Sequence, residues 1–324
     1  MSGPQAGPVL VLGATGFVGR HVCSAFLAAG REVVAVSRRA GRVPGAAGAR
    51  PLALDAAAAG TADLTRLLTD LAPGTVVNAA GAFWGCTPAE MAVSNEVLVE
   101  RVLDALARAP VRPRLVQLGT LHEYGAAPPG AALDEDAPLR PVSPYGQGKA
   151  RAATAILAAA ASGRVDAVVL RVSNAIGPGM PRQSLLGTVA AALAAAPRAG
   201  GRAVLDLYAL DAHRDFVDVR DVGGAVVAAA DAPVAGKAIN IGRGAAIGVR
   251  EVVARLVATS GVAADVRERP PDRGAGHGGR DRQALDVGRA AELLGWKPRY
   301  GLDDSLRALW RAWPREEEAT GEVP

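Results

Sequence analysis

The first 172 residues alternate between short apolar runs and longer segments with helical periodicity. The predicted strands are Pro8–Leu12, Glu32–Val36, Pro51–Leu54, Thr75–Asn78, Leu115–Leu118 and Val165–Arg171. The predicted helices between them are Phe17–Ala29, Leu64–Leu71, Ser94–Arg108 and Pro144–Ala161. Strands that are apolar on both faces and separated by helices indicate a parallel sheet covered on both sides. We therefore predict an α/β fold with a doubly wound, Rossmann-like parallel sheet.

A glycine-rich turn, Gly13-Ala-Thr-Gly-Phe-Val-Gly19, joins the first predicted strand to the first predicted helix. Gly13 permits a tight turn, and Gly16 lets backbone N–H groups approach a pyrophosphate at the helix N-terminus. Gly19 lets the helix pack closely on the sheet. The turn therefore predicts a dinucleotide site, with these expected contacts: Gly13, Thr15, Gly16, Phe17, Val18 and Gly19.

The end of the second predicted strand carries Ser37, Arg38 and Arg39, where an NAD site usually has a carboxylate for the adenosine ribose. A hydroxyl and two guanidiniums suit a 2′-phosphate, which they can bind through charge-assisted hydrogen bonds. We therefore predict NADP(H) rather than NAD(H). The alternative is that both arginines are solvated surface side chains. Asp55, after the third predicted strand, is expected to accept a hydrogen bond from the adenine amino group.

Tyr145 and Lys149 lie four residues apart at the start of a predicted helix that Ser143 caps and Pro144 opens. This spacing puts both side chains on one face of the helix. The Lys149 ammonium is expected to lower the pKa of the Tyr145 phenol and to hold the nicotinamide ribose. Tyr145 is then suited to acid–base catalysis. The Thr120 hydroxyl, after a predicted strand, is expected to bind a substrate oxygen beside it.

With these motifs, the chain resembles the extended short-chain dehydrogenase/reductases that act on nucleotide sugars, over nearly its whole length. The motifs similar to the wider superfamily are Gly13-Ala-Thr-Gly-Phe-Val-Gly19, Asn78-Ala-Ala-Gly81, Thr120-Leu-His-Glu-Tyr-Gly125 and Pro144-Tyr-Gly-Gln-Gly-Lys149. Those similar to the nucleotide-sugar branch are Arg171-Val-Ser-Asn-Ala-Ile-Gly-Pro-Gly179, Arg214-Asp-Phe-Val-Asp-Val-Arg-Asp221, Asn240-Ile-Gly242 and Leu294-Gly-Trp-Lys-Pro298.

The resemblance implies that Tyr145 is the acid/base, Lys149 its partner and Thr120 the hydroxyl that orients the sugar oxygen. It also implies that Asn95 is the family's structural and proton-relay asparagine. The further cofactor contacts expected, beyond Tyr145 and Lys149 themselves, are Ala79, Ala80, Gly81 and Arg171. The expected substrate contacts are Phe83, Trp84, Thr120, His122, Asn174, Arg214, Arg280 and Arg282.

Alternative interpretations remain open for several of these side chains. Phe83 and Trp84 either stack on the sugar or nicotinamide or anchor their own loop. His122 is either a substitute proton donor or a packed, substrate-side histidine. Arg280 and Arg282 either bind the sugar diphosphate, as is expected of Arg214, or are solvated loop arginines.

The sequence also departs from the family pattern. Gly119 stands where the family often has Ser, Gly148 replaces a usual Ser, and Ile176 replaces a common Tyr. None of these changes removes a catalytic group. The family's dehydratases carry Asp and Glu directly after the catalytic Thr, but here these positions are Leu121 and His122. Dehydratase chemistry is therefore disfavoured.

Three functions compete. The first is NADP(H)-dependent reduction of a keto group on a nucleotide sugar, with a dTDP-4-keto-6-deoxyhexose of deoxysugar biosynthesis as the expected substrate by analogy. The second is an NAD-dependent nucleotide-sugar epimerase. The third is a non-catalytic dinucleotide sensor, which would not need Thr120, Tyr145 and Lys149. The two arginines after the second strand favour the reductase, because an epimerase regenerates its own cofactor.

Composition excludes several other classes. The net charge is only +4 and there is no basic run beyond Arg38-Arg39, so nucleic-acid binding is not expected. The four histidines and two cysteines lack ligand spacing, so no metal site and no disulfide framework are expected. The alanine tracts are too short to cross a bilayer and there is no signal peptide, so we expect a cytoplasmic protein.

The regular alternation fades after residue 172, although helices are predicted at Leu185–Ala195, Val249–Thr259 and Arg289–Leu294. We predict that residues 1–172 form the NAD(P)-binding region, rejoined by roughly 213–241. Residues 173–324 mainly form a smaller substrate-binding region, and the tail 314–324 is expected to be disordered. The resemblance also implies a homodimer.

Overall fold

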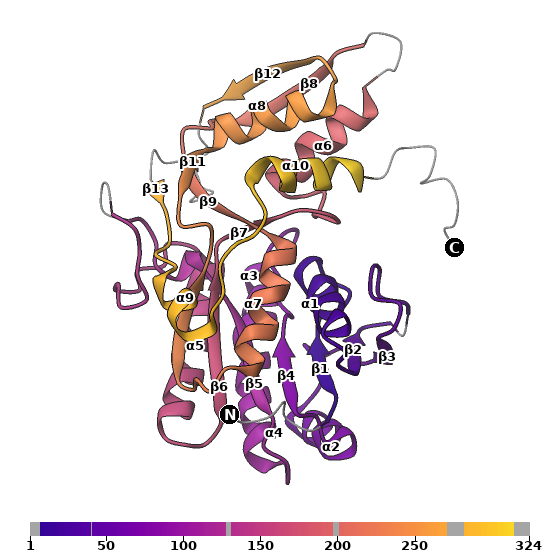
Figure 1. The fold of residues 1–324 in the computed structure, drawn as a ribbon, viewed down its shortest axis with the longest axis vertical. Helices are drawn as coiled ribbons and strands as arrows, with labels where there is room; N and C mark the ends of the chain where they lie inside the picture. The colour runs from indigo at the N-terminus through magenta and orange to yellow at the C-terminus, as the bar shows by residue number, and fades with distance from the viewer. Residues whose placement is uncertain (1–6, 40, 128–130, 197–200, 271–281, 314–324) are drawn as a thin grey trace.

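A parallel sheet of seven strands forms the centre of the larger part of the molecule (Figure 1). The structure is a computed structural model, and it describes residues 7–39, 41–127, 131–196, 201–270 and 282–313. The strands are β1 (Val9–Leu12), β2 (Val33–Ser37), β3 (Arg50–Ala53), β4 (Thr75–Asn78), β5 (Arg114–Thr120), β6 (Asp166–Val172) and β10 (Lys237–Ile241). Their order is β10-β6-β5-β4-β1-β2-β3, so the winding reverses between β1 and β4. The predicted doubly wound fold is confirmed.

Helices cover both faces of this sheet, as the apolar strands require. On one face lie α1 (Phe17–Ala28) and α7 (Val219–Asp231); on the other lie α2 (Thr61–Leu71), α4 (Leu98–Arg108) and α5 (Pro144–Ala161). Alternate residues of β1 pack against the helices on the two faces of the sheet. Val9 and Val11 pack in the core with α1, whereas Leu10 and Leu12 pack in the core with α2 and α4. Burial on both sides of the sheet holds the strand ends rigidly at the edge where the motifs gather.

The structure corrects the predicted single helix Ser94–Arg108. A shorter helix, α3 (Pro88–Ala92), begins after Thr87, whose hydroxyl accepts a hydrogen bond from the backbone N–H of Glu90. A π-helical turn, Val93–Val97, then joins α3 to α4. The capping sequence Thr-Pro-Ala-Glu was the local signal for the earlier start. Asn95 lies inside the π-helical turn.

A second group of elements lies beyond the carboxyl ends of the large sheet (Figure 1). One small sheet contains β7 (Asn174–Ile176), β9 (His213–Asp218), β11 (Ala246–Gly248) and β13 (Arg282–Gln283). A parallel pair contains β8 (Ala203–Tyr208) and β12 (Ala264–Arg269). The helices here are α6 (Leu185–Ala195), α8 (Val249–Ser260) and α10 (Leu302–Arg311), while α9 (Gly288–Leu294) lies beside β10. This group has a core of its own, in which Val189, Leu205, Val252 and Leu306 are buried.

The two groups of elements are joined through the start of α7. Asp218, at the end of β9, accepts a hydrogen bond from the hydroxyl of Ser305 on α10 at 2.7 Å. One carboxylate oxygen of Asp221 accepts from the backbone N–H groups of Arg299 and Tyr300, both at 3.0 Å. The carboxyl-terminal segment is therefore fixed to the helix that covers the large sheet. The assignment of cofactor to one group and substrate to the other stays a prediction.

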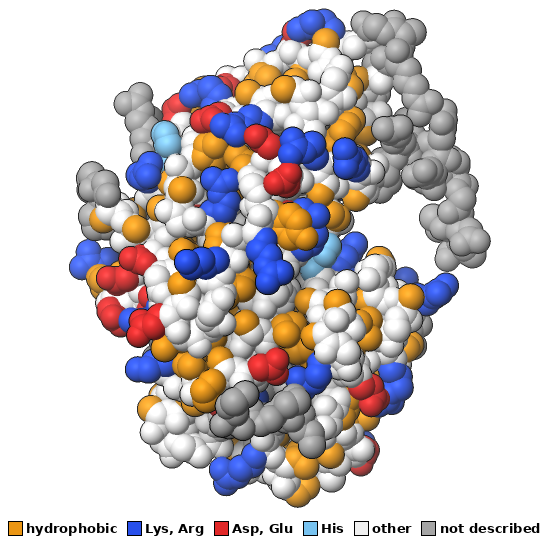
Figure 2. Space-filling model, viewed as in Figure 1, with side chains coloured by type: hydrophobic (Ala, Val, Ile, Leu, Met, Phe, Trp, Pro, Cys, Tyr) orange, Lys and Arg blue, Asp and Glu red, His pale blue; other side chains and the backbone are white. Residues whose placement is uncertain are grey.

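The surface in Figure 2 carries acidic and basic side chains interspersed, with no single-sign patch on the face shown. Within the residues that the structure describes, no helix is long and apolar enough to cross a membrane. The same residues contain no group of three or more potential metal ligands. The tail 314–324 and Arg280 lie outside the described residues.

Candidate functional site

The glycine-rich turn has the geometry that its sequence predicts. Gly13 has φ = 77°, and a Cβ there would lie 2.8 Å from the backbone N of Ala80 at the end of β4. A Cβ at Gly19 would collide with the carbonyl oxygen of Gly13. Gly16 is the N-cap of α1, whose first N–H groups have no acceptor within the helix. The residues present therefore fit a dinucleotide whose pyrophosphate sits at this helix N-terminus.

The carboxyl end of β2 presents Arg38 and Arg39 as exposed side chains. The Ser37 hydroxyl donates to the carbonyl of Arg39 at 2.8 Å and so closes this turn. One carboxylate oxygen of Asp55 accepts from the backbone N–H of Ala57 at 3.1 Å, which shapes the loop after β3. The two guanidiniums are thus accessible to a ligand. The contacts of these residues with a 2′-phosphate and with adenine stay predictions.

The three residues predicted for catalysis gather at the carboxyl end of β5. Thr120 is the last residue of β5, and its Oγ1 accepts from the backbone N–H of His122 at 3.3 Å. Tyr145 and Lys149 lie in the first turns of α5, with Lys149 Nζ 6.0 Å from the centroid of the Tyr145 ring. Lys149 Nζ also donates to the carbonyl oxygen of Leu118 at 3.0 Å. The strand end and the helix face thus bring together a hydroxyl, a phenol and an amine.

The pKa values of this group differ from the expectation. Burial raises the pKa of Tyr145 to about 12, the negative charge of Glu123 adds to the rise, and a hydrogen bond with Thr120 opposes it. The predicted lowering of the Tyr145 pKa by Lys149 is therefore not found, because desolvation of the phenolate is the larger effect. Burial also lowers the pKa of Lys149 to about 8, and the charge of Glu123 opposes that fall.

Asn95 lies next to this group. Its Nδ2 donates to the carbonyl oxygens of Ala82 and Met91 at 2.8 and 2.9 Å. Its buried Oδ1 has no hydrogen-bond partner within the described part of the chain. A Cβ at Gly81 would lie 2.8 Å from that Oδ1 and 3.3 Å from Lys149 Nζ, so the glycine keeps open a polar space between the two side chains.

Aromatic rings line the same end of the sheet. The Phe83 ring lies 4.5 Å from the Tyr145 ring and 6.0 Å from the His122 ring, centroid to centroid. Trp84 packs edge-on against Phe83 at 5.0 Å and is 41% exposed. The loop after β4 therefore places Phe83 and His122 beside the phenol. Whether these rings contact a sugar stays a prediction.

A buried polar network that the sequence analysis missed lies below the site. Arg171 Nε donates to Glu123 at 2.8 Å, and Arg171 Nη1 donates to the Tyr124 hydroxyl at 2.9 Å. That hydroxyl donates to Asn240 Oδ1 at 2.7 Å, and the Asn240 N–H donates to Glu135 at 2.8 Å. Arg171 is only 3% exposed, so this geometry favours a structural role and its cofactor contact stays a prediction. The sequence signal for this network was Glu123, an acidic residue four positions after Gly119.

The residues predicted to bind a diphosphate lie on the small sheet. Asn174 opens β7 and donates from Nδ2 to the carbonyl of Asp215 at 2.8 Å. Arg214 lies on the neighbouring strand β9 and donates from Nη1 to the carbonyl of His213 at 3.0 Å. Arg282 opens β13, which pairs with β9 at His213, and is exposed. The fold therefore brings these three polar side chains onto adjacent strands.

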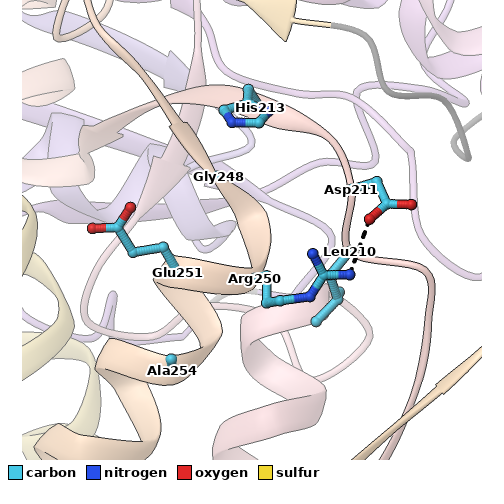
Figure 3. A pocket seen from close by; sticks show the side chains of 7 residues that line it. All are labelled: Leu210, Asp211, His213, Gly248, Arg250, Glu251 and Ala254. Atoms are coloured by element: carbon cyan, nitrogen blue, oxygen red, sulfur yellow. Dashed lines mark hydrogen bonds and ion pairs between the residues drawn. The ribbon is translucent and has the colours of Figure 1, made fainter.

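A shallow hollow on the second group of elements shares no residue with the predicted site (Figure 3). Its lining residues are Leu210, Asp211, His213, Gly248, Arg250, Glu251 and Ala254. Figure 3 shows Arg250 directed at Asp211, with which it forms an ion pair at 2.9 Å. Arg250 also pairs with Glu268 at 2.7 Å, so its charge is already balanced by two carboxylates.

The parallel sheet and the glycine-rich turn fit a dinucleotide-binding protein, and the similarity to the NAD(P)-dependent relative described below supports an oxidoreductase. Residues 9–242 match the NAD dependent epimerase/dehydratase family, and the chain belongs to that family. The predicted resemblance is thereby confirmed.

Named relatives fit this assignment. The chain is 43% identical to dTDP-6-deoxy-L-talose 4-dehydrogenase (NAD(P)(+)) of Kitasatospora kifunensis, over 96% of this chain and 98% of the relative. It is 28% identical to UDP-glucose 4-epimerase of Mycolicibacterium smegmatis, over 92% of this chain and 95% of the relative. Among solved structures, MoeE5 in complex with UDP-glucuronic acid and NAD is similar, with a TM-score of 0.80 and 29% identity. That match covers 94% of this chain and 98% of MoeE5.

Proposed function

We propose that the protein reduces the 4-keto group of a dTDP-bound 6-deoxyhexose, with NADP(H) as its favoured cofactor. The observation that carries this proposal is the 43% identity to dTDP-6-deoxy-L-talose 4-dehydrogenase over nearly both full lengths. The grouping of Thr120, Tyr145 and Lys149 at one strand end supports it, because these side chains are suited to proton exchange with a sugar oxygen.

A nicotinamide dinucleotide supplies the hydride for ketone reduction when it is bound. Reduction of the ketone would place negative charge on the carbonyl oxygen, which the side chains of this site would protonate and hydrogen-bond. The Tyr145 hydroxyl donates its proton to that oxygen, and the Thr120 hydroxyl hydrogen-bonds it. The Lys149 ammonium then stabilises the phenolate that remains on Tyr145.

The pKa of Tyr145 determines which form of the phenol is present in the ligand-free site. Burial raises this pKa to about 12, so the phenol is protonated at neutral pH. Ketone reduction needs this protonated form, since the phenol gives up its proton as the alcohol forms. Alcohol oxidation instead needs the phenolate, which the ligand-free site disfavours. The protonated phenol therefore suits the reduction half of this reversible reaction, whereas the net direction depends on the supply of reduced cofactor.

The cofactor preference is supported by the exposed pair Arg38 and Arg39 at the end of β2. Two guanidiniums at this place favour the extra phosphate of NADP(H) over the ribose hydroxyls of NAD(H). The name of the Kitasatospora relative includes both cofactors. We accordingly propose a preference for NADP(H) rather than exclusive use of it.

The substrate site proposed here spans both groups of elements. Phe83 and His122 border Tyr145 and would contact the hexose ring. Asn174, Arg214 and Arg282 lie on adjacent strands and would bind the diphosphate, which carries about two negative charges. The separation of ring-binding and charge-binding side chains suits an elongated nucleotide sugar.

The test is a coupled pair of assays with dTDP-6-deoxy-L-talose and its 4-keto form. Oxidation with NADP⁺ or NAD⁺ and reduction with NADPH or NADH are followed by nicotinamide absorbance, and the sugar products are identified by NMR. Tyr145→Phe is the inactive control, because it keeps the ring and removes only the hydroxyl. Absence of turnover in both directions, with cofactor binding intact, would contradict the proposed function.

The second candidate is an NAD-dependent nucleotide-sugar epimerase. It is favoured by the 28% identity to UDP-glucose 4-epimerase and by the likeness to MoeE5 with NAD. An epimerase converts one sugar isomer into another without net oxidation of the cofactor. Incubation of UDP-glucose with the protein and catalytic NAD, followed by NMR of the sugar, separates the two functions.

A further inference from the structure

Gly119 and Glu123 lie next to each other at the end of β5, and the absence of a side chain at Gly119 leaves space for the Glu123 carboxylate. A Cβ added at Gly119 would lie 2.5 Å from Oε1 of Glu123, which is closer than real Cβ contacts allow. A Ser at position 119, which the family often has, would therefore not fit beside this carboxylate. The loss of the side chain at 119 makes room for the carboxylate of Glu123.

The Glu123 carboxylate is fully buried and both of its oxygens accept hydrogen bonds. Oε1 accepts from the backbone N–H of Thr120 at 2.8 Å, and Oε2 accepts from Arg171 Nε at 2.8 Å. These bonds fix the peptide that carries the Thr120 hydroxyl. Burial raises the pKa of Glu123, and the Arg171 guanidinium and the Thr120 N–H oppose that rise because they stabilise the charged carboxylate.

The Glu123 carboxylate also affects the charge state of the buried Lys149. The Lys149 ammonium is 5% exposed and donates to the carbonyl of Leu118, the peptide group just before Gly119. The titratable side chains that face it are Tyr145 from its own helix and Glu123 from the turn after β5, and Arg171 from β6 pairs with Glu123. Glu123 is the only carboxylate that acts on Lys149 among the described residues, and its charge opposes the effect of burial on the Lys149 pKa.

We propose that Glu123 is a positioning residue of the reductase site, which fixes Thr120 through the backbone and keeps the buried Lys149 ammonium charged. The catalytic part of this role rests on the proposed function, whereas the effect of Glu123 on the charge of Lys149 is a property of the ligand-free protein. Arg171 orients the carboxylate, and Gly119 provides the space that it occupies.

The decisive experiment is a pH titration of Lys149 by NMR in the ligand-free protein. The chain has only three lysines, Lys149, Lys237 and Lys297, so ¹³Cε-labelled lysine gives three signals that single Lys→Arg variants assign. Glu123→Gln keeps the size of the side chain, but it removes the charge and one of the two acceptor oxygens. Its Lys149 signal is expected to titrate about one pH unit or more below that of the unaltered protein.

The matched control is Asp166→Asn. Asp166 pairs with the buried Arg114 at 3.0 Å, at the opposite end of the same two strands, so it also removes a carboxylate from an arginine pair. This variant is expected to leave the Lys149 titration unchanged. An unchanged titration in Glu123→Gln, or an equal shift in Asp166→Asn, would overturn the proposal. Since no substrate is present, neither result depends on the proposed reaction.

Two further measurements complete the test. Gly119→Ala is expected to lower the melting temperature more in the unaltered protein than in a Glu123→Ala background, because only the former holds the colliding carboxylate. Equal losses of melting temperature in the two backgrounds would refute the claim that Gly119 makes room for the Glu123 carboxylate. With active enzyme, Glu123→Gln is expected to move the loss of kcat/KM for reduction to lower pH. A purely structural role would lower stability and leave this pH profile in place.

Discussion

Lys149 Nζ donates a hydrogen bond to the backbone carbonyl oxygen of Leu118 at 3.0 Å, so the amine of α5 is fixed to the end of β5. The next peptides along this strand carry Gly119 and Thr120. A helix side chain and a strand end are thereby held in one arrangement, before any ligand binds. The catalytic predictions below depend on this fixed geometry.

The Tyr145 hydroxyl is predicted to be the proton donor. Tyr145→Phe is expected to lower single-turnover ketone reduction by about 10²–10⁴-fold, because proton transfer by a positioned side chain contributes that much. Cofactor affinity, measured by fluorescence, is expected to change little. Tyr208→Phe is the control, since Tyr208 lies on β8 and is 58% exposed. Near-normal turnover in Tyr145→Phe would show that another group supplies the proton.

The pH dependence of reduction is predicted from Lys149. Burial lowers the pKa of Lys149 to about 8, so its ammonium is present below that pH and is lost as the pH rises through it. The charge that stabilises the Tyr145 phenolate disappears with it. We therefore expect kcat/KM for reduction to fall as the pH rises through about 8, since kcat/KM reports groups of the free enzyme. A profile that is level across this range would contradict the role of Lys149.

Arg38 is predicted to select the cofactor. Arg38→Ala is expected to weaken NADPH binding by about ten- to a hundredfold, because a hydrogen bond to a charged group contributes roughly 1.5–3 kcal/mol. NADH binding is expected to change little. Arg66→Ala on α2 is the control, since Arg66 is also exposed. Isothermal calorimetry with both cofactors measures the effect, and equal losses for NADPH and NADH would rule out a 2′-phosphate contact.

Gly19 is predicted to be required for the close packing of α1 on the glycine-rich turn. The Cβ of Gly19→Ala would collide with the carbonyl oxygen of Gly13, so α1 has to move away from the turn. We expect a loss of about 1–3 kcal/mol in the free energy of unfolding and weaker binding of both cofactors. The control is Gly41→Ala, whose Cβ meets nothing within 4 Å. Denaturant unfolding of the two variants side by side gives the comparison.

A homodimer is predicted to form by pairing of α4 and α5 with their copies across a two-fold axis, as a four-helix bundle. The outer face of α5 exposes Thr154 and Ala158, and such small side chains let a second copy of the helix approach closely. We expect a dimeric mass by light scattering at micromolar concentration, and a monomeric mass for Ala158→Arg. A monomeric mass for the unaltered protein would refute the prediction.

Local patterns predicted the large sheet and its helices well. The strand Thr75–Asn78 and the helices Pro144–Ala161 and Leu185–Ala195 have the predicted bounds. These segments combine apolar periodicity with clear ends, such as Ser143 before α5, whose hydroxyl accepts from the N–H of Gly146. The meeting of Tyr145 and Lys149 on one helix face follows from their spacing alone.

Other features could not be read from neighbouring residues. The ion pair of Glu123 and Arg171 joins positions 48 residues apart, and only the pairing of β5 with β6 brings them together. The pKa of Tyr145 depends on how deeply the fold buries it, which outweighs the charge that spacing suggested. The short strands of the small sheet, such as β11, are held by partners distant in sequence rather than by their own composition.

The position of β10 in the large sheet determines when that sheet can be completed during synthesis of the chain. β10 pairs in parallel with β6 along residues 237–241, although β7, β8 and β9 are made between them. A chain that emerges from the ribosome therefore cannot complete its first sheet until the first elements of the second group, from β7 to β9, have been synthesised. Until then β6 has an open edge, and α7 has not yet covered its face. The elements of the two groups alternate along the chain, so a single cut in the gene does not separate them into two complete units.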